Sequence, residues 1–514
     1  MSGRKEIAVK SSLIGLLSQS SSLVLQIISR KVFIQFIGEE ILGLNGTFTS
    51  ILSTLSLAEL GFQSAISFNL YSPICEKDEN KINAIVNIFR LVYRFLGIFF
   101  IIASIVILPF LKFFLRDIEI TNDIYFYFLL QALSSSCTYF LAYKRTIMYA
   151  DQKEYVYKTI DTIMNFIFKS AQIYVIVKLH DYYLYLIIQI VQVYVSNIIV
   201  HFICKKKYPY LHKEKLNKAY LKKIFGDVKE ISIGRLAAYV YASTDNLIIS
   251  KFLGTVKVAA LGNYTTVITN LRLLVNSILG PMTPIIGNYL AEKKEEGNQE
   301  KKFDLYFHLR YIFDLILLVP TYVLVDDFVA MWLDESFVLP EEIKILLIAD
   351  IYIVILHGAC TDYITAKGLF KQNRQILGVS TILNLVISLV GVKLWGISGV
   401  LFGTVCSQIY NYLGYGLIVY KYCFVSKLKG FGRYILRSIQ YTVCFLIIVF
   451  LCKFVYGSLG MGIGLVKFFC GGIVCEFLIA ILYLLFFIGN KERKEMFSII
   501  TQALKKKIIS MKSR

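Results

Sequence analysis

The stretch Thr244–Gly254 reads TDNLIISKFLG and closes an apolar run that extends over residues 231–254. It ends in the same way as an earlier stretch, Ser29–Gly38, which reads SRKVFIQFIG. Apolar runs of about 20 residues are long enough to cross a bilayer as helices. A charged side chain at the bilayer centre costs about 2.5–3.5 kcal/mol, so Asp245 and Arg30 need either partners or water. The two stretches therefore predict a membrane protein with a polar interior.

The composition supports this class. The chain has 514 residues, of which 56% are hydrophobic, and its mean hydropathy is +0.62. Charged residues make up only 18% of it, against about 25% in soluble domains. The net charge of +20 comes from Lys and Arg in short segments between apolar runs, as in the cytoplasmic loops of membrane proteins, so we expect no nucleic-acid binding. The ten cysteines lack zinc-site spacing, and we expect no metal and no cofactor.

About fourteen apolar runs are long enough to span a membrane. With the N-terminus inside, about forty Lys and Arg fall on the cytoplasmic side and fewer than about ten outside, which is the bias of the positive-inside rule. We therefore predict an all-α integral membrane protein with about 14 transmembrane helices and with both termini cytoplasmic. The predicted spans are 11–37, 41–71, 84–111, 121–143, 156–178, 183–204, 231–254, 258–290, 305–326, 341–366, 376–394, 397–420, 434–456 and 464–489.

An internal repeat organises these helices. Phe36–Gly38 matches Phe252–Gly254 at a shift of 216 positions, and the spacing F-[IL]-G-x7-G-x-[FY]-T continues without a gap. The repeat pairs the end of the first predicted helix with the end of the seventh, as a parallel duplication of six helices produces. We predict two pseudo-symmetric six-helix lobes followed by two additional helices. The predicted parts are an N-terminal lobe at 1–204, a basic cytoplasmic linker at 205–230, a C-terminal lobe at 231–423, helices 13 and 14 at 424–490, and a basic cytoplasmic tail at 491–514.

Two long segments carry a resemblance to a known family. SRKVFIQFIGEEILGLNGTFTSILSTLSLAELGFQSAISFNLY, residues 29–71, resembles the N-terminal signature of polysaccharide exporters, and TDNLIISKFLGTVKVAALGNYTTV, residues 244–267, resembles their helix-7 signature. These proteins are the Wzx-like flippases of the multidrug/oligosaccharidyl-lipid/polysaccharide (MOP) superfamily. The resemblance implies alternating access between two facing lobes and an undecaprenyl-diphosphate oligosaccharide as cargo. It also implies that the last two helices are similar to those that form a lipid-tail groove in the related lipid II flippase.

Polar residues at helical spacing suggest where such a cargo would bind. Arg binds diphosphate well because its planar fork contacts two oxygens at once. Four predicted helices of the N-terminal lobe each present a polar face, which is typical of a bundle with a wet interior. Arg90 and Arg94 either load the diphosphate or reach to the inner headgroups. The predicted substrate-binding residues are Arg30 and Gln26 in helix 1, Asn83, Asn87, Arg90 and Arg94 in helix 3, Lys169 in helix 5, and Arg272 in helix 8.

Acidic residues within the predicted spans are candidates for coupling or gating. We predict that Asp245 serves coupling or gating, either as an inter-helix ion pair with Arg272 or a cation of the first lobe, or as a proton site. The alternative is a static pair that only holds helices together. Asp350 and His357 share a face of helix 10 and form either a H⁺ or Na⁺ site or a packing contact. Glu59 and Asp161 complete this set.

Asp314 follows Arg310 by four residues, so we expect a local helix pair between them.

The sequence thus favours a transporter over an enzyme, located in the bacterial cytoplasmic membrane, with no catalytic residue assigned. Its expected partners are the lipid-linked oligosaccharide, membrane lipid and, for surface polysaccharide assembly, a polysaccharide polymerase or glycosyltransferases. One alternative is a cation-coupled multidrug exporter of the same superfamily, although such exporters usually have twelve helices. A second alternative is a membrane glycan polymerase or transferase, which the short outer loops disfavour.

Overall fold

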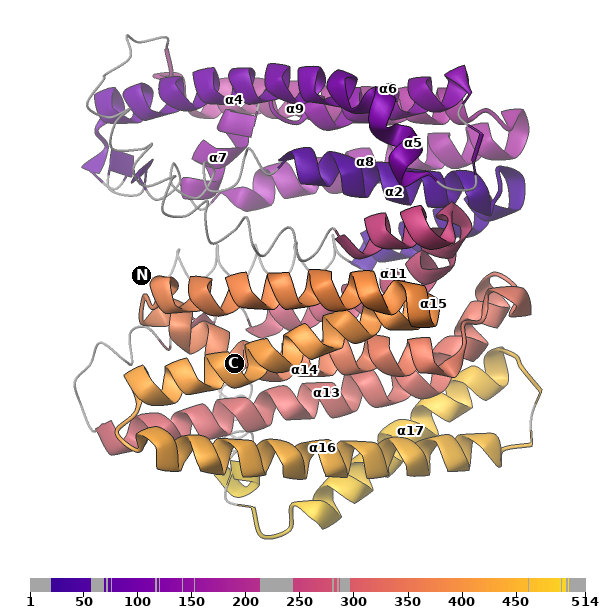
Figure 1. The fold of residues 1–514 in the computed structure, drawn as a ribbon. Coiled ribbons are helices and arrows are strands. Elements are labelled where there is room, and N and C mark those ends of the chain that lie inside the picture. Colours follow the sequence, from indigo (N-terminus) through magenta and orange to yellow (C-terminus); the bar gives the residue numbers. More distant parts are fainter. Residues whose placement is uncertain are drawn as a thin grey trace, which may run out of the picture. The chain divides into compact units, whose positions relative to one another are not determined.

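The computed structural model describes 15 stretches of the chain, and every regular element within them is a helix (Figure 1). The described residues are 20–56, 69–70, 73–74, 76–115, 118–119, 121–140, 142–151, 153–212, 244–279, 282–283, 286, 296–460, 462–490, 492–495 and 498. Two compact units divide the chain. Unit 1 comprises Met1–Gly262 and Asn384–Val400, and unit 2 comprises Asn263–Leu383 and Leu401–Arg514. The boundaries expected from the sequence for the two lobes, the linker and the tail remain predictions.

The first described helix of unit 1 covers residues 20–36, and a series of long helices follows it. Large apolar side chains of α4, α6, α7 and α9 form its main core, where Phe89 and Phe128 are fully buried. Phe33 of the first helix packs instead on Tyr182 and Tyr185, at the start of α9. The helices are α2 (Glu39–Leu55), α4 (Glu79–Ile107), α5 (Leu111–Phe114), α6 (Asn122–Cys137), α7 (Ala142–Ala150), α8 (Glu154–Leu179) and α9 (Tyr182–Lys207), with a 3₁₀ turn, η2 (Leu108–Phe110), between α4 and α5.

The repeated glycines of the sequence occupy equivalent places in the backbone. Gly38 has φ 105° and directly precedes α2, whereas Gly254 has φ 94° and directly precedes α11 (Thr255–Leu279). Positive φ is unfavourable for residues with a Cβ, so glycine is the residue that allows the chain to leave one helix and begin the next within one or two positions. The same local geometry therefore recurs in both copies of the motif.

Unit 2 is built on α13 (Glu296–Trp332), which packs against α14 (Glu341–Ala366), α16 (Lys427–Gly457) and α17 (Leu465–Phe486). Aromatic rings line the contact between α13 and α16; Tyr311 stacks on Tyr441 with ring centroids 4.2 Å apart, and both side chains are fully buried. His308 lies beside them and bonds to two hydroxyl groups, with Nδ1 2.7 Å from Tyr441 Oη and Nε2 2.8 Å from Tyr483 Oη. This histidine thus joins both of the last two helices to α13. A 3₁₀ turn, η3 (Glu335–Phe337), connects α13 with α14.

One element, α15 (Phe370–Cys423), covers both the eleventh and the twelfth predicted spans. It is 54 residues long, and its helical geometry breaks at Gly396, which has φ 60° and ψ −131°. The break lies between the predicted spans 376–394 and 397–420. The two arms meet closely on either side of it, since Ser388 Oγ donates to the carbonyl of Val400 at 3.0 Å.

Seven helices among the described residues are long and apolar enough to cross a membrane, and the chain is a multi-pass membrane protein. Each of them overlaps one or two of the predicted spans. The total of fourteen and the cytoplasmic termini remain predictions. The seven helices are Glu79–Phe114, Tyr155–Leu179, Tyr182–Lys207, Glu341–Ala366, Phe370–Cys423, Lys427–Gly457 and Leu465–Phe486.

Candidate functional site

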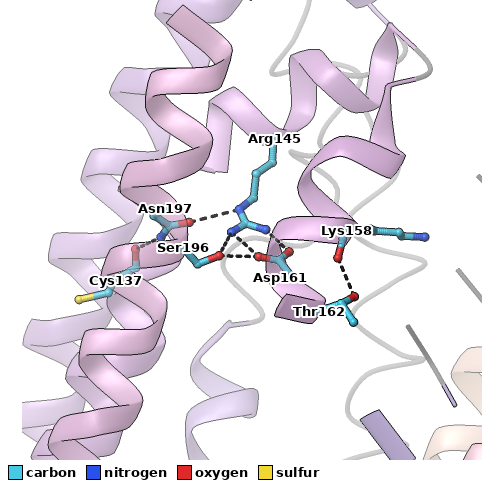
Figure 2. A network of polar contacts seen from close by, with 7 residues as sticks. All are labelled: Cys137, Arg145, Lys158, Asp161, Thr162, Ser196 and Asn197. Atoms are coloured by element: carbon cyan, nitrogen blue, oxygen red, sulfur yellow. Dashed lines mark hydrogen bonds and ion pairs between the residues drawn. The ribbon is translucent and has the colours of Figure 1, made fainter. Parts of the chain in front are cut away.

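A charged network joins three helices of unit 1 (Figure 2). Arg145 of α7 binds both carboxylate oxygens of Asp161 of α8, and its Nη2 lies 2.9 Å from Oδ1. Ser196 of α9 donates to the same Oδ1 at 2.6 Å and accepts from Arg145 Nη2 at 3.2 Å. Asn197 accepts from Arg145 Nε at 3.2 Å and donates to the carbonyl of Cys137 at 3.1 Å. The guanidinium fork therefore holds α7, α8 and α9 together through one carboxylate.

This network gives Asp161, a predicted coupling residue, the partner that a charge within an apolar helix requires. The side chains of Asp161 and Arg145 are still 39% and 24% exposed, so the pair is accessible rather than sealed in the core. In the sequence, Arg145 falls between the predicted spans 121–143 and 156–178, among the cations expected in short loops. No helical spacing connects the two residues, because the chain turns between α7 and α8. The only sequence signal for this pair was an acid, Asp161, within an apolar span, which requires a nearby cation.

Polar contacts continue along the facing sides of α8 and α9. Asn165 Oδ1 accepts from Gln192 Nε2 at 3.4 Å, one turn beyond Asp161. Farther along, Lys169 Nζ donates to Tyr185 Oη at 3.1 Å and Gln172 Nε2 donates to the Tyr185 carbonyl at 3.0 Å. We call this row the α8–α9 polar seam. It consists of Asp161, Asn165, Lys169 and Gln172 of α8 with Tyr185, Gln192 and Ser196 of α9.

Arg30 contacts the beginning of α11, which carries the second copy of the repeated motif. Its Nη2 donates to the carbonyl of Ala259 at 2.9 Å. A Cβ at Gly262 would lie 2.5 Å from the same nitrogen, so the motif glycine leaves room for the guanidinium. Gln26, one turn earlier on the first helix, is exposed and donates to Ser22 Oγ at 3.3 Å. The bond to the Ala259 carbonyl orients the Arg30 guanidinium.

The polar stripe of α4 divides into two parts. Asn83 and Asn87 are buried and bind the chain that follows α9: Asn83 Nδ2 donates to the Tyr210 carbonyl at 3.0 Å, and Asn87 Nδ2 donates to the His212 carbonyl at 2.9 Å. Arg90 is half-buried and Arg94 is exposed on a face shared with exposed apolar side chains. A common role of these two arginines and Arg30 in cargo binding remains a prediction.

Asp245, the residue of the opening stretch, is half-buried in the helix over residues 244–253. The adjacent Asn246 donates to Ser50 Oγ of α2 at 3.2 Å. Asn246 stands 216 positions after Arg30, and the two residues make reciprocal contacts: Arg30 reaches α11 and Asn246 reaches α2. The pairing of Asp245 with Arg272 remains a prediction, and Glu59 lies outside the described residues.

In unit 2, Asp350 and His357 of α14 converge on Gln408. Gln408 Oε1 lies 3.3 Å from His357 Nε2, and Asp350 is close to both Gln408 and the charge of Arg272. Oδ1 of Asp350 is buried and has no hydrogen-bond partner among the described residues. The two predicted coupling residues and the predicted cation Arg272 thus belong to one polar neighbourhood. Within the described part of the chain, no group of three His, Cys, Asp or Glu is placed to hold a metal ion.

The expected pair of Arg310 with Asp314 is wrong. Arg310 Nη2 donates to Asp362 Oδ2 of α14 at 2.6 Å, and Nη1 donates to the carbonyl of Ile355 at 3.0 Å. Gly358 makes this crossing possible, because a Cβ there would lie 1.9 Å from Nη1. Asp314 is completely buried, and neither carboxyl oxygen has a hydrogen-bond partner among the described residues. The arginine leaves its own helix because the neighbouring helix offers both a carboxylate and a carbonyl.

Comparison with known proteins places the chain in a family. Residues 41–338 match the family described as "Polysaccharide biosynthesis protein", which is more than half of the chain. The chain belongs to this family. No curated protein matches the sequence.

The fold of this chain is similar to those of solved membrane transporters. The lipid II flippase MurJ in an inward closed conformation aligns with a TM-score of 0.66 at 14% identity, over 93% of this chain and 99% of that one. A multidrug resistance MATE family transporter of the MOP superfamily, inward-facing, aligns with a TM-score of 0.62 at 11% identity, over 79% of this chain and 96% of that one. A mutant of the Vibrio cholerae MATE transporter VcmN aligns with a TM-score of 0.55 at 15% identity, over 82% and 99%. The family match confirms the resemblance to proteins of polysaccharide assembly, and the solved structures confirm the transporter-like fold.

Proposed function

We propose that this chain is a flippase that moves an undecaprenyl-diphosphate-linked oligosaccharide from the inner to the outer face of the bacterial cytoplasmic membrane by alternating access. The cargo would supply surface polysaccharide biosynthesis. The observation that carries the proposal is Arg30, a cation within an apolar helix whose guanidinium is fixed by the Ala259 carbonyl and accommodated by the motif glycine Gly262. A fixed guanidinium is suited to a diphosphate, which offers paired oxygens.

Two further observations support a lipid-linked glycan. The α8–α9 polar seam offers hydroxyl and amide groups within two apolar spans, which suits sugar hydroxyls. The likeness to the lipid II flippase extends over 93% of this chain, whereas the likeness to the two MATE transporters extends over 79% and 82%. The family to which the chain belongs also concerns polysaccharide biosynthesis.

The energy source is part of the proposal. The membrane potential is negative inside, so it favours the outward movement of an anionic headgroup by about 2.3 kcal/mol per charge per 100 mV. The pair of Asp350 and His357 at Gln408 would supply a H⁺ or Na⁺ site, because the free Oδ1 of Asp350 is an acceptor for either ion. Arg272 would tune this site through its charge.

The test is translocation of a fluorescent undecaprenyl-diphosphate oligosaccharide in proteoliposomes. We compare the wild type with Arg30→Gln and with a matched control, Lys31→Gln, which removes the same charge from the exposed next position of the same helix. The expected result is translocation by the wild type and by Lys31→Gln and a loss of at least about tenfold in Arg30→Gln, since a lost hydrogen bond to a charged group costs about 1.5–3 kcal/mol.

One outcome contradicts the proposed function, and a second contradicts the role of Arg30 in it. If the wild type moves none of several such lipids but exports cationic dyes, the chain is a multidrug exporter, the alternative weighed from the sequence. If it moves the lipids and both variants are equally active, the flippase activity stands and Arg30 is not part of the cargo site.

A further inference from the structure

A basic cluster of unit 1 joins α4, α7 and α9, and none of its members belongs to the α8–α9 polar seam. It consists of Arg90 and Arg94 of α4, Lys144 of α7, and His201 and Lys205 of α9. Lys144 is within electrostatic reach of Arg90, Lys205 and His201. Tyr143 is within reach of both arginines. Like charges repel, and a bound anion would stabilise a cluster of this kind.

The described residues provide no acidic partner for this cluster. No ion pair joins Arg90, Arg94, Lys144 or Lys205 to an Asp or Glu among them, whereas Arg145, the residue after Lys144, is fully paired. The acid at the end of α7, Asp151, is engaged by the Tyr208 hydroxyl at 2.7 Å and by Lys153 at 2.5 Å.

Lys144 is the most informative member of the cluster because it is buried, with only 8% of its surface exposed. Lysine is almost never buried unless it is paired. Burial, together with the neighbouring Lys205 and Arg90, lowers the pKa of its ammonium below the usual value. A bound anion would offset both effects.

The position of the cluster identifies the source of that anion. α4 has 29 residues and is therefore about 44 Å long, which exceeds the apolar core of a bilayer, about 30 Å. Its first turns bind the chain after α9 through Asn83 and Asn87, and its exposed apolar side chains begin only at Leu91. On α9 the exposed apolar side chains end at Phe202, which is 65% exposed, and lysines follow from Lys205.

Both helices thus change from apolar to cationic at the cluster, which is the height of lipid headgroups. Arg94 is exposed on the apolar side of this boundary, one turn beyond Arg90. Basic pockets between transmembrane helices at the cytoplasmic surface are suited to anionic lipid headgroups.

We infer that the basic cluster of α4, α7 and α9 binds the phosphate of an anionic phospholipid from the inner leaflet of the membrane. Arg90 and Arg94 approach the headgroup from the bilayer side, and Lys144 contacts it from the protein interior. The acyl chains lie along the exposed face of α4, over Phe95 and Ile98. This site is independent of the proposed transport function, because it requires only a membrane with negatively charged lipids.

The experiment measures the binding of phosphatidylglycerol and phosphatidylcholine to the purified full-length protein by native mass spectrometry. The test variant is Arg90→Gln/Arg94→Gln/Lys144→Gln. The matched control, Lys371→Gln/Arg374→Gln/Lys421→Gln, removes three cations from unit 2 on the same predicted side of the membrane. Each cation near an anionic headgroup strengthens binding about fivefold. We therefore expect about 100-fold weaker phosphatidylglycerol binding in the test variant, about fivefold weaker binding in Arg94→Gln alone, and no change in the control.

Because Arg94 is exposed, the single variant remains informative even where loss of Lys144 prevents folding. Equal affinity of the wild type for the two lipids overturns the inference, as does equal phosphatidylglycerol binding by wild type and Arg94→Gln. Full displacement of the lipid by millimolar inorganic phosphate would assign the cluster to a soluble anion. If the variants lose undecaprenyl diphosphate but keep phosphatidylglycerol, the cluster belongs to the cargo, and the inference fails while the proposed function stands.

Discussion

Asp161→Asn tests the charged network of α7, α8 and α9 directly. The carboxylate accepts three hydrogen bonds, two from Arg145 and one from Ser196, and the amide retains only one acceptor oxygen. Breaking a fully buried ion pair costs about 3–5 kcal/mol. Here the two charged side chains are 39% and 24% exposed, so water recovers part of that cost. We expect the free energy of unfolding to fall by about 2 kcal/mol, because one strongly charge-assisted interaction is lost.

A double-mutant cycle isolates the pair from other effects of the substitution. Asp161→Asn, Arg145→Gln and the double variant are unfolded by SDS titration in detergent micelles, with Glu335→Gln as a control at an exposed acid that has no described ion pair. The expected coupling free energy is about 1.5 kcal/mol, within the range of residues in contact, and Arg145→Lys should recover only part of it because an ammonium lacks the fork. Coupling below about 0.5 kcal/mol would refute the view that this pair holds the three helices together.

Four other substitutions probe the remaining contacts. Asp362→Asn should destabilise unit 2 by about 3 kcal/mol, since it leaves the buried guanidinium of Arg310 without its carboxylate. Asp314→Asn should change stability by less than about 1 kcal/mol, because the amide replaces a buried ionisable group that has no described partner. Equal losses of stability on SDS titration would contradict this difference. Gly262→Ala should displace Arg30 and reduce lipid translocation about tenfold while stability stays within about 1 kcal/mol of wild type, and unchanged translocation would separate the arginine from transport. His308→Phe should cost about 1–3 kcal/mol through two unpaired tyrosine hydroxyls, and a stability equal to wild type would show that this histidine does not anchor the last two helices.

The sequence by itself determined the membrane class, the approximate positions of the spans and the repeat. These properties depend on local quantities. Hydropathy over about 20 residues decides whether a helix can cross a bilayer, and the positive φ of Gly38 and Gly254 is a property of single positions. The repeated glycines were therefore recognisable before their shared geometry was known, and the helices of the structure overlap the predicted runs.

Only the tertiary structure decided which charges meet. Arg145 lies 16 residues before Asp161, and Arg310 lies 52 residues before Asp362, so no helical period connects either pair. Each pairing depends on which faces of neighbouring helices turn toward each other and on whether a small residue leaves space at the crossing, as Gly358 does. The spacing rule for a single helix predicted the wrong partner for Arg310 because a carboxylate on the adjacent helix, together with a backbone carbonyl, satisfies more of the guanidinium than a carboxylate one turn away.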